Sequence, residues 1–364
     1  MTKAIQSDPR KGFVPRYLPW LLAGLMLVIY GFTLNHWISV ANLNAVAGVS
    51  GWTWQPEVAN PLTYLLTRPF AWLPAAQIPL ALNGFSTLLA AMVIGLLARS
   101  VALLPQDRTE AQRLRETSGF SFLTIREAWL PPVLAALVCG LQFTFWQLAT
   151  NFTGDLISLL VFAFAVWSLL EFRLDEREGR LMLMALVYGA GMTQDYGLIG
   201  FLPLLLAALV WIRGLGFFNA RFLARLLLCG LAGMSLYLLL PTLAALSGRL
   251  TVPGVWWQAL KYSLASQGAV GIYFFQHPEF RHSLMVISLS SLLPVVMMSI
   301  RWAAAFGDRS RVGTAITGIM VHLICAVLLG ISLWVAFDPP ISARRQLYPL
   351  PCLPFYFLAA LSVG

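Results

Sequence analysis

The stretch IPLALNGFSTLLAAMVIGLLA, residues Ile78–Ala98, contains no charged residue. It is long enough to cross the hydrocarbon core of a bilayer as a helix, which takes about 20 apolar residues. Similar runs recur along the 364-residue chain, which is 59% hydrophobic and only 11% charged. That composition is typical of polytopic membrane proteins. Membrane barrels alternate apolar and polar residues at every second position, and these runs do not, so the sequence predicts an all-α helical bundle.

We expect about ten transmembrane helices, with boundaries good to a few residues. The fifth is short for a span and is expected to be kinked or tilted. The first is too long for a signal peptide and is expected to be retained. The predicted spans are Tyr17–Trp37, Ile78–Ala98, Trp129–Ala149, Leu156–Phe172, Leu181–Met192, Tyr196–Trp211, Phe222–Leu246, Leu284–Ile300, Val312–Phe337 and Leu347–Gly364.

The distribution of basic residues predicts the orientation of these spans. With the amino terminus in the cytoplasm, most of the 24 Lys and Arg residues fall in cytoplasmic loops. This bias is the positive-inside signal of membrane proteins. It also accounts for the net charge of +9, so no nucleic-acid partner is needed to explain that charge. We expect an integral protein of the bacterial cytoplasmic (inner) membrane.

Residues 1–364 are expected to form a single transmembrane domain. Within it, residues 38–76 form a long loop on the non-cytoplasmic face. The two moderately apolar halves of this loop are too short to span, and both contain Trp or Tyr. Segments of this kind lie in the membrane interface as amphipathic helices. The aromatic residues on this face fit an interfacial belt or a platform for a sugar ring or lipid head group.

Carboxylates at span ends on the non-cytoplasmic face are the main catalytic candidates. Asp155 and Asp195 occupy short turns between successive spans, and Glu57 lies in the first long loop. A carboxylate at membrane depth costs about 2.5–3.5 kcal/mol, so it is rarely kept without a use. Other interpretations remain open: Asp155 suits a helix amino terminus, Asp195 suits a tight turn, and Glu57 suits a solvated loop.

Basic residues on the same face are candidate ligands for a lipid phosphate. The adjacent Arg344 and Arg345 precede the last span, and guanidinium groups bind phosphate oxygens bidentately. They also suit a snorkelling anchor. Arg68 and His277 are further phosphate-binding candidates. No motif predicts a metal site or any certain cofactor, although two interfacial carboxylates could hold a divalent ion.

Four segments of the chain follow the sequence pattern of a known membrane family. They are Ala59–Leu97, LQFTFWQLATNFTGDLISLLVF (Leu141–Phe162), LMALVYGAGMTQDYGLIGFLPLLLA and the tail ARRQLYPLPCLPFYFLAAL. The matching residues are Pro61, Leu62, Arg68, Pro69, Phe70, Phe145, Trp146 and Ala149. On these residues the chain resembles, over most of its length, the family catalogued as domain of unknown function 2723. That family includes a eukaryotic protein O-mannosyltransferase and is similar to glycosyltransferases of the C superfamily.

The chain departs from this family at its expected catalytic acids. Ala41 and Asn44 stand where the first-loop Asp and Glu of the family would be, and Thr153 stands at a later Glu. Either the acids have moved to Asp155 and Asp195, or the usual catalysis has been lost. The family often carries a soluble carboxy-terminal region, and this chain stops within an apolar run. One interpretation is therefore that it is a fragment.

The resemblance implies a glycosyltransferase-C-like fold and three possible functions. The first is sugar transfer from a polyprenyl-phosphate donor to an unknown protein or glycan acceptor on the extracytoplasmic face. The second is a non-catalytic homologue that binds a lipid-linked sugar or a membrane partner. The third, a transporter or flippase, is disfavoured because transporters place polar residues near the bilayer midplane, whereas here the acids fall at span ends.

Overall fold

The computed structural model describes residues 13–52, 60–104, 129–246 and 353–364, with scattered positions between 257 and 334. Every regular element in these residues is a helix, which confirms the all-α prediction for the described part. The elements are α1 (Phe13–Arg16), α2 (Leu18–Phe32), α3 (Leu43–Ser50), α4 (Pro61–Thr67), η2 (Arg68–Trp72), α5 (Ile78–Leu103), α7 (Leu130–Gly140), α8 (Phe143–Thr150), α9 (Asp155–Asp175), α10 (Glu178–Gln194), η4 (Tyr196–Phe201), α11 (Leu202–Arg213), η5 (Gly214–Phe218), α12 (Ala220–Met234), η6 (Ser235–Leu238), α13 (Leu239–Leu246) and α19 (Leu353–Val363).

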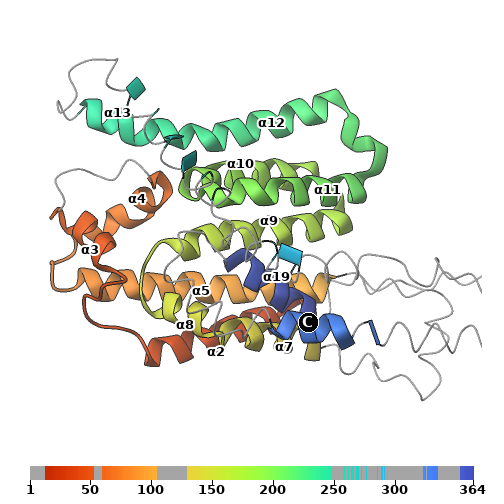
Figure 1. The fold of residues 1–364 in the computed structure, drawn as a ribbon, viewed down its shortest axis with the longest axis horizontal. Coiled ribbons are helices and arrows are strands. Elements are labelled where there is room, and N and C mark those ends of the chain that lie inside the picture. Colours follow the sequence, from red (N-terminus) through yellow and green to blue (C-terminus); the bar gives the residue numbers. More distant parts are fainter. Residues whose placement is uncertain are drawn as a thin grey trace, which may run out of the picture.

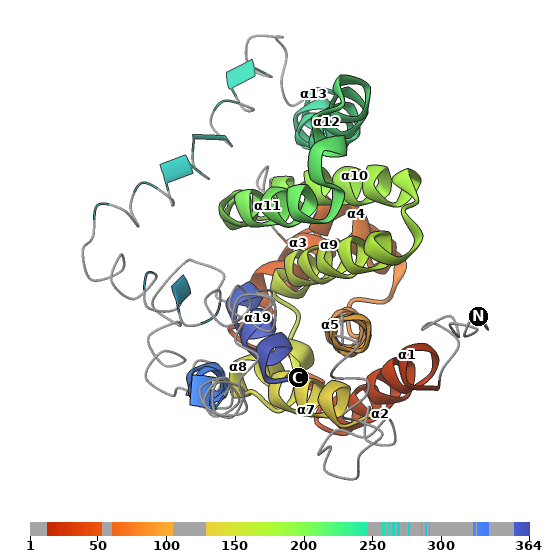
Figure 2. The same ribbon diagram turned by 90° about the vertical axis from the view of Figure 1, so that its right-hand side faces the viewer.

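Helix α5 is the central element of the bundle. It packs against α2, α7 and α8 on one side and against α9 on the other (Figures 1 and 2). Its apolar residues continue around the whole helix, and Leu82, Ile94 and Leu97 are fully buried. A helix that is apolar on all sides is stable only when it is surrounded by other apolar groups. The sequence of α5 thus accounts for its central position.

The third predicted span is a broken helix. Helices α7 and α8 meet at a bend of 71°. The break frees backbone groups that need other partners in an apolar environment. The Tyr30 hydroxyl donates to the Gly140 carbonyl at 2.8 Å, and the Gln142 side-chain oxygen accepts from the Phe145 amide at 2.6 Å. The predicted span Trp129–Ala149 is therefore interrupted in the structure, as two helices joined at a bend.

Helices α10 and α12 pack closely through glycines. A Cβ atom added at Gly189 would overlap the Gly230 carbonyl, and one at Gly233 would lie 2.6 Å from the Ala190 amide nitrogen. Small residues at such positions let helix backbones approach each other, as in many membrane helix pairs. Helix α12 lies at the edge of the bundle, and α10 lies between α12 and α9 (Figure 1).

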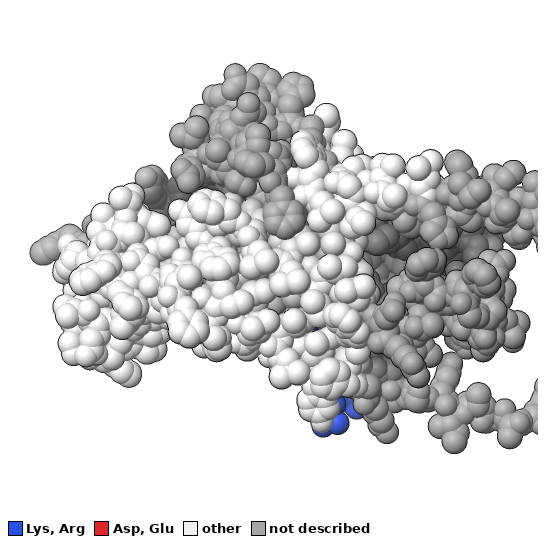
Figure 3. Space-filling view, turned by 90° about the horizontal axis from the view of Figure 1, so that it is seen from below, with Lys and Arg blue, Asp and Glu red and all other residues white. Residues whose placement is uncertain are grey.

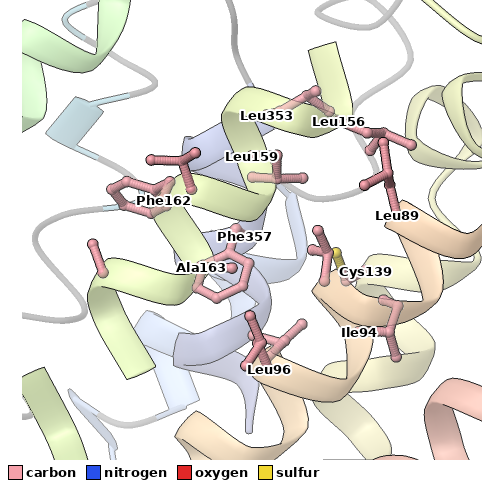
Figure 4. Packing of buried hydrophobic residues seen from close by; sticks show 14 of the residues in the cluster. Leu89, Ile94, Leu96, Cys139, Leu156, Leu159, Phe162, Ala163, Leu353 and Phe357 are labelled. Carbon is pink, nitrogen blue, oxygen red and sulfur yellow. The ribbon is translucent and has the colours of Figure 1, made fainter. Parts of the chain in front are cut away.

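Helix α19 completes the core from a distant part of the sequence. Nearly all of its residues are buried among α7, α9 and α5. The Phe355 ring lies 4.9 Å from that of Phe201, and the Phe357 ring lies 5.8 Å from that of Phe162. Figure 4 shows Phe357 among the apolar side chains of this cluster. Aromatic pairs at these distances stabilise a core beyond the area they bury.

Ion pairs gather at one end of the long helices. The Arg99 guanidinium donates to Glu171 at 2.6 Å, and Glu171 is only 2% exposed. Arg180 also approaches Glu171, while Arg213 pairs with Glu178. Glu171 follows Asp155 by 16 residues on α9, so at about 1.5 Å per residue it lies roughly 24 Å from Asp155. The helices thus separate a paired, arginine-rich end from the end that carries Asp155.

Four described helical segments are long and apolar enough to cross a membrane: Ile78–Leu103, Asp155–Asp175, Gly197–Phe218 and Ala220–Leu243. The bent α7–α8 pair would be a fifth, and α2 and α19 are shorter apolar helices. The face viewed in Figure 3 is almost free of charged side chains over its described part. These features are compatible with an integral membrane protein. Most of the predicted spans Leu284–Ile300 and Val312–Phe337 lies outside the described residues.

Replacing Gly233 with alanine is expected to lower the free energy of unfolding by about 1–3 kcal/mol, because the new Cβ would overlap the backbone of α10. Gly230→Ala is the matched control on the same helix, since its Cβ would meet only the Ala185 carbonyl, at 3.9 Å. Alanine favours helix by up to about 1 kcal/mol over glycine, so the control should be neutral or stabilised. Thermal unfolding in detergent measures both. Equal stability of the two variants would contradict the close α10–α12 packing.

Candidate active site at the Asp155–Asp195 end

Short helices cover the end of the bundle where α9 begins and α10 finishes. Helices α3 and α4 lie across this end (Figure 1). They belong, with η2, to the loop of residues 38–76 for which the sequence predicts interfacial helices. Helix α4 contacts α10, and α3 contacts α5. The loop therefore folds back onto the ends of the long helices.

Asp155 is the first residue of α9 and is exposed. The preceding Gly154 has a φ of +94°, a left-handed conformation that glycine adopts at little cost. The Thr153 hydroxyl donates to the Asp155 carboxylate at 3.0 Å. A negative charge in the first turn of a helix is favoured by the helix dipole. These features hold an ionisable carboxylate at the surface of this end.

Asp195 occupies the turn between α10 and η4 and is half-buried. Its Oδ1 accepts a hydrogen bond from the Gly197 amide at 2.8 Å. Burial raises the pKa of Asp195 from 3.8 to about 6, the Gly197 hydrogen bond lowers it, and the nearby charge of Asp155 adds to the rise. A carboxylate that titrates near neutral pH is suited to accept a proton as a general base.

Thr63 joins three separate segments at this end. Its backbone amide donates to the Gln194 side-chain oxygen at 3.0 Å, which ties α4 to the last residue of α10. A Cβ at Gly154 would lie 3.2 Å from the Thr63 hydroxyl oxygen and 3.6 Å from Gln194 Nε2. The turn that carries Asp155 and the turn that carries Asp195 therefore meet beside α4.

Arg68 is exposed and begins η2, directly after α4. Its guanidinium carbon lies 5.9 Å from the centroid of the Tyr64 ring, one helical turn earlier. This is the range of a cation–π contact. Of the predicted phosphate-binding residues, Arg68 alone belongs to the part of the chain that the structure describes. Arg344, Arg345 and His277 lie outside it, as does the predicted base Glu57, so their roles stay predictions.

An asparagine network beneath the site was not predicted from the sequence. Asn83 of α5 is fully buried; its side-chain oxygen accepts from Asn42 at 3.1 Å and from the Phe152 amide at 2.9 Å. Its amide group donates to the Asn35 carbonyl at 2.7 Å. Asn83 thus fixes the first loop and the α8–α9 turn to the central helix. An asparagine inside a largely apolar span was the available signal.

The first loop also contains the positions at which the resembling family has its catalytic acids. Asn42 is buried in the asparagine network, whereas Asn44, at a position where the resembling family has an acid, is exposed.

Among the described residues, no group of three or more His, Cys, Asp or Glu side chains is arranged to hold a metal ion. A divalent ion held by Asp155 and Asp195 stays a prediction.

A match to a known protein family covers the centre of the chain. Residues 58–214 match the family model of the protein O-mannosyl-transferase TMEM260 N-terminal domain. The matched range includes α4, Arg68, Asp155 and Asp195. No curated protein and no solved structure matches the chain. The match supports the predicted resemblance to a protein O-mannosyltransferase-like family over these residues.

The raised pKa of Asp195 predicts a pH-dependent effect of Asp195→Asn. Between pH 3.8 and about 6 the folded protein binds more protons at this site than the unfolded chain, so stability falls as pH rises through this window. Asparagine cannot ionise but keeps an oxygen for the Gly197 amide. The variant should therefore match the wild type near pH 4 and exceed it at pH 8, by at most about 3 kcal/mol.

Thermal unfolding in detergent at the two pH values measures this difference. Asp195→Ala is the control, since it also removes the hydrogen-bond acceptor and should be less stable than Asp195→Asn at both pH values. A stability difference between Asp195→Asn and wild type that is the same at pH 4 and pH 8 would show that the Asp195 carboxyl is not held protonated by burial.

Proposed function

We propose that the protein is a membrane glycosyltransferase that moves a sugar from a polyprenyl-phosphate donor to a hydroxyl acceptor on the extracytoplasmic face. The observation that carries this proposal is that the turns next to Asp155 and Asp195 meet beside α4, within a region that matches a protein O-mannosyltransferase N-terminal domain. In this proposal the chain has about ten spans in a glycosyltransferase-C-like arrangement. Its amino terminus is cytoplasmic, and its membrane is the bacterial inner membrane.

The charge distribution along the bundle supports this orientation. Arg99, Arg180 and Arg213 lie at the end of the helices opposite Asp155. Arginines accumulate on the cytoplasmic side of membrane proteins. The end with Asp155 and Asp195 is then extracytoplasmic, where the helices of loop 38–76 lie at the membrane surface beside the lipid-linked donor.

Asp195 acts as the general base in the proposed reaction. Its carboxylate takes the proton of the acceptor hydroxyl, and the acceptor oxygen attacks the anomeric carbon of the sugar. The bond between that carbon and the phosphate oxygen breaks, and the lipid phosphate leaves with the electron pair. Asp155 raises the pKa of Asp195 and so brings it nearer to neutral pH.

Arginine side chains stabilise the departing phosphate. Arg68 is exposed at the start of η2, on the helical segment that α10 holds at this end. A guanidinium group offers several donors to phosphate oxygens and remains charged throughout the reaction. Arg344, Arg345 and His277 are proposed to contribute to the same anion site, and Glu57 to assist as a second base.

A non-catalytic homologue that binds the same lipid is the second candidate function. It is favoured by the departures at Ala41 and Asn44. Such a protein would bind polyprenyl phosphate through its arginines without transferring a sugar. Both candidate proteins would bind polyprenyl phosphate, but only the enzyme would transfer a sugar. Binding and transfer assays on one preparation of the purified protein therefore distinguish them.

Sugar transfer from radiolabelled polyprenyl-phosphate mannose or glucose is expected to rise with pH, with a midpoint near 6, because only the ionised Asp195 accepts a proton. Asp195→Asn should lower the rate by about 10²–10⁴-fold and remove this rise. Asp155→Asn should move the midpoint to lower pH, since it removes the neighbouring negative charge.

The matched control is Glu176→Gln, an exposed acid just beyond the opposite end of α9, which should leave transfer unchanged. Full transfer by both aspartate variants would exclude these acids from the mechanism. Binding of the lipid phosphate without any transfer by the wild type would favour the non-catalytic function instead.

A further inference from the structure

Helix α4 receives a cap from a distant part of the chain. The first amides of any helix have no partner within that helix. At the start of α4 the N-cap residue, Asn60, makes no side-chain capping bond. The Thr63 amide is instead satisfied by the side chain of Gln194, 131 positions later in the sequence. The position of α4 therefore depends on Gln194.

Gln194 also lies next to the candidate base. It is the last residue of α10, and Asp195 follows it directly. The Gly154 turn packs against the same threonine, so the Asp155 turn shares this junction. Arg68 stands at the other end of α4, about one and a half turns from Thr63. The Gln194 side chain thus links α4, which Arg68 follows, to the turn that contains Asp195.

We propose that Gln194 is a positioning residue, which fixes α4 and the Arg68 side of the donor site relative to Asp195. This inference rests on the proposed function, in which Arg68 binds the lipid phosphate. Gln194 itself does not touch the reacting atoms. It sets the distance between the group that binds the phosphate and the group that takes the proton, and bound geometry of this kind controls transfer rates.

Gln194→Leu removes the acceptor and keeps a side chain of similar size. Loss of a helix cap costs about 0.5–2 kcal/mol, so amide exchange in residues 60–72 should become about 2-fold to 30-fold faster. The KM for polyprenyl-phosphate mannose should rise by a similar factor, with a smaller change in kcat, because donor binding depends on α4. The midpoint of the pH–rate profile should stay near 6, since Asp195 is intact.

Gln194→Glu is the conservative variant, because a carboxylate oxygen also accepts from the Thr63 amide. It should restore slow exchange in residues 60–72 and the wild-type KM. The added negative charge beside Asp195 should move the pH midpoint upward. A residue needed only for folding would not produce this combination of restored KM and shifted midpoint. Gln147→Leu, the same substitution at an exposed glutamine of α8, is the matched control and should behave as the wild type.

Three results would overturn the inference in different ways. Unchanged exchange and unchanged KM in folded Gln194→Leu would show that Gln194 does not hold α4. Faster exchange with an unchanged KM would show that it caps α4 without positioning the donor. A wild type that neither binds polyprenyl phosphate nor transfers a sugar would reject the proposed function, and with it the positioning role, while the exchange data would still report the cap.

Discussion

Every backbone amide and carbonyl inside an apolar slab needs a partner within the protein, because lipid tails provide none. The long helices satisfy this requirement internally, and side chains satisfy it wherever a helix is interrupted. Tyr30 and Gln142 supply the partners at the α7–α8 break. Gln194 supplies one at the start of α4. The same constraint therefore explains both the straight parts of the bundle and the polar contacts that lock its irregular parts.

Polar groups consequently collect at the two ends of the helices, and the two ends differ in chemistry. At one end Glu171 is buried between Arg99 and Arg180, and its charge is compensated. Breaking a buried pair of this kind is strongly destabilising, so this end is expected to be rigid. At the other end, burial and the neighbouring charge of Asp155 both disfavour the ionised form of Asp195.

The environments of the two aspartates suit a division of roles. Asp155 is exposed at a helix start, whereas Asp195 is half-buried in a turn. Two titratable groups with different surroundings are a recurrent arrangement in acid–base catalysis. The asparagine network around Asn83 holds the α8–α9 turn, and Gln194 holds α4. The site is thus supported by contacts from the first loop and from the central helix.

The sequence by itself determined the helical class, the positions of most described helices and the location of Asp155 and Asp195 at the ends of apolar segments, because apolar run length and turn residues act locally. It did not predict the bend between α7 and α8, since the break depends on side-chain partners such as Tyr30 on another helix. Only the tertiary structure decided that Thr63, Gly154 and Gln194 meet, and that burial would raise the pKa of Asp195. Contacts between residues so far apart in the chain arise from how whole helices pack, and local sequence patterns do not encode that packing.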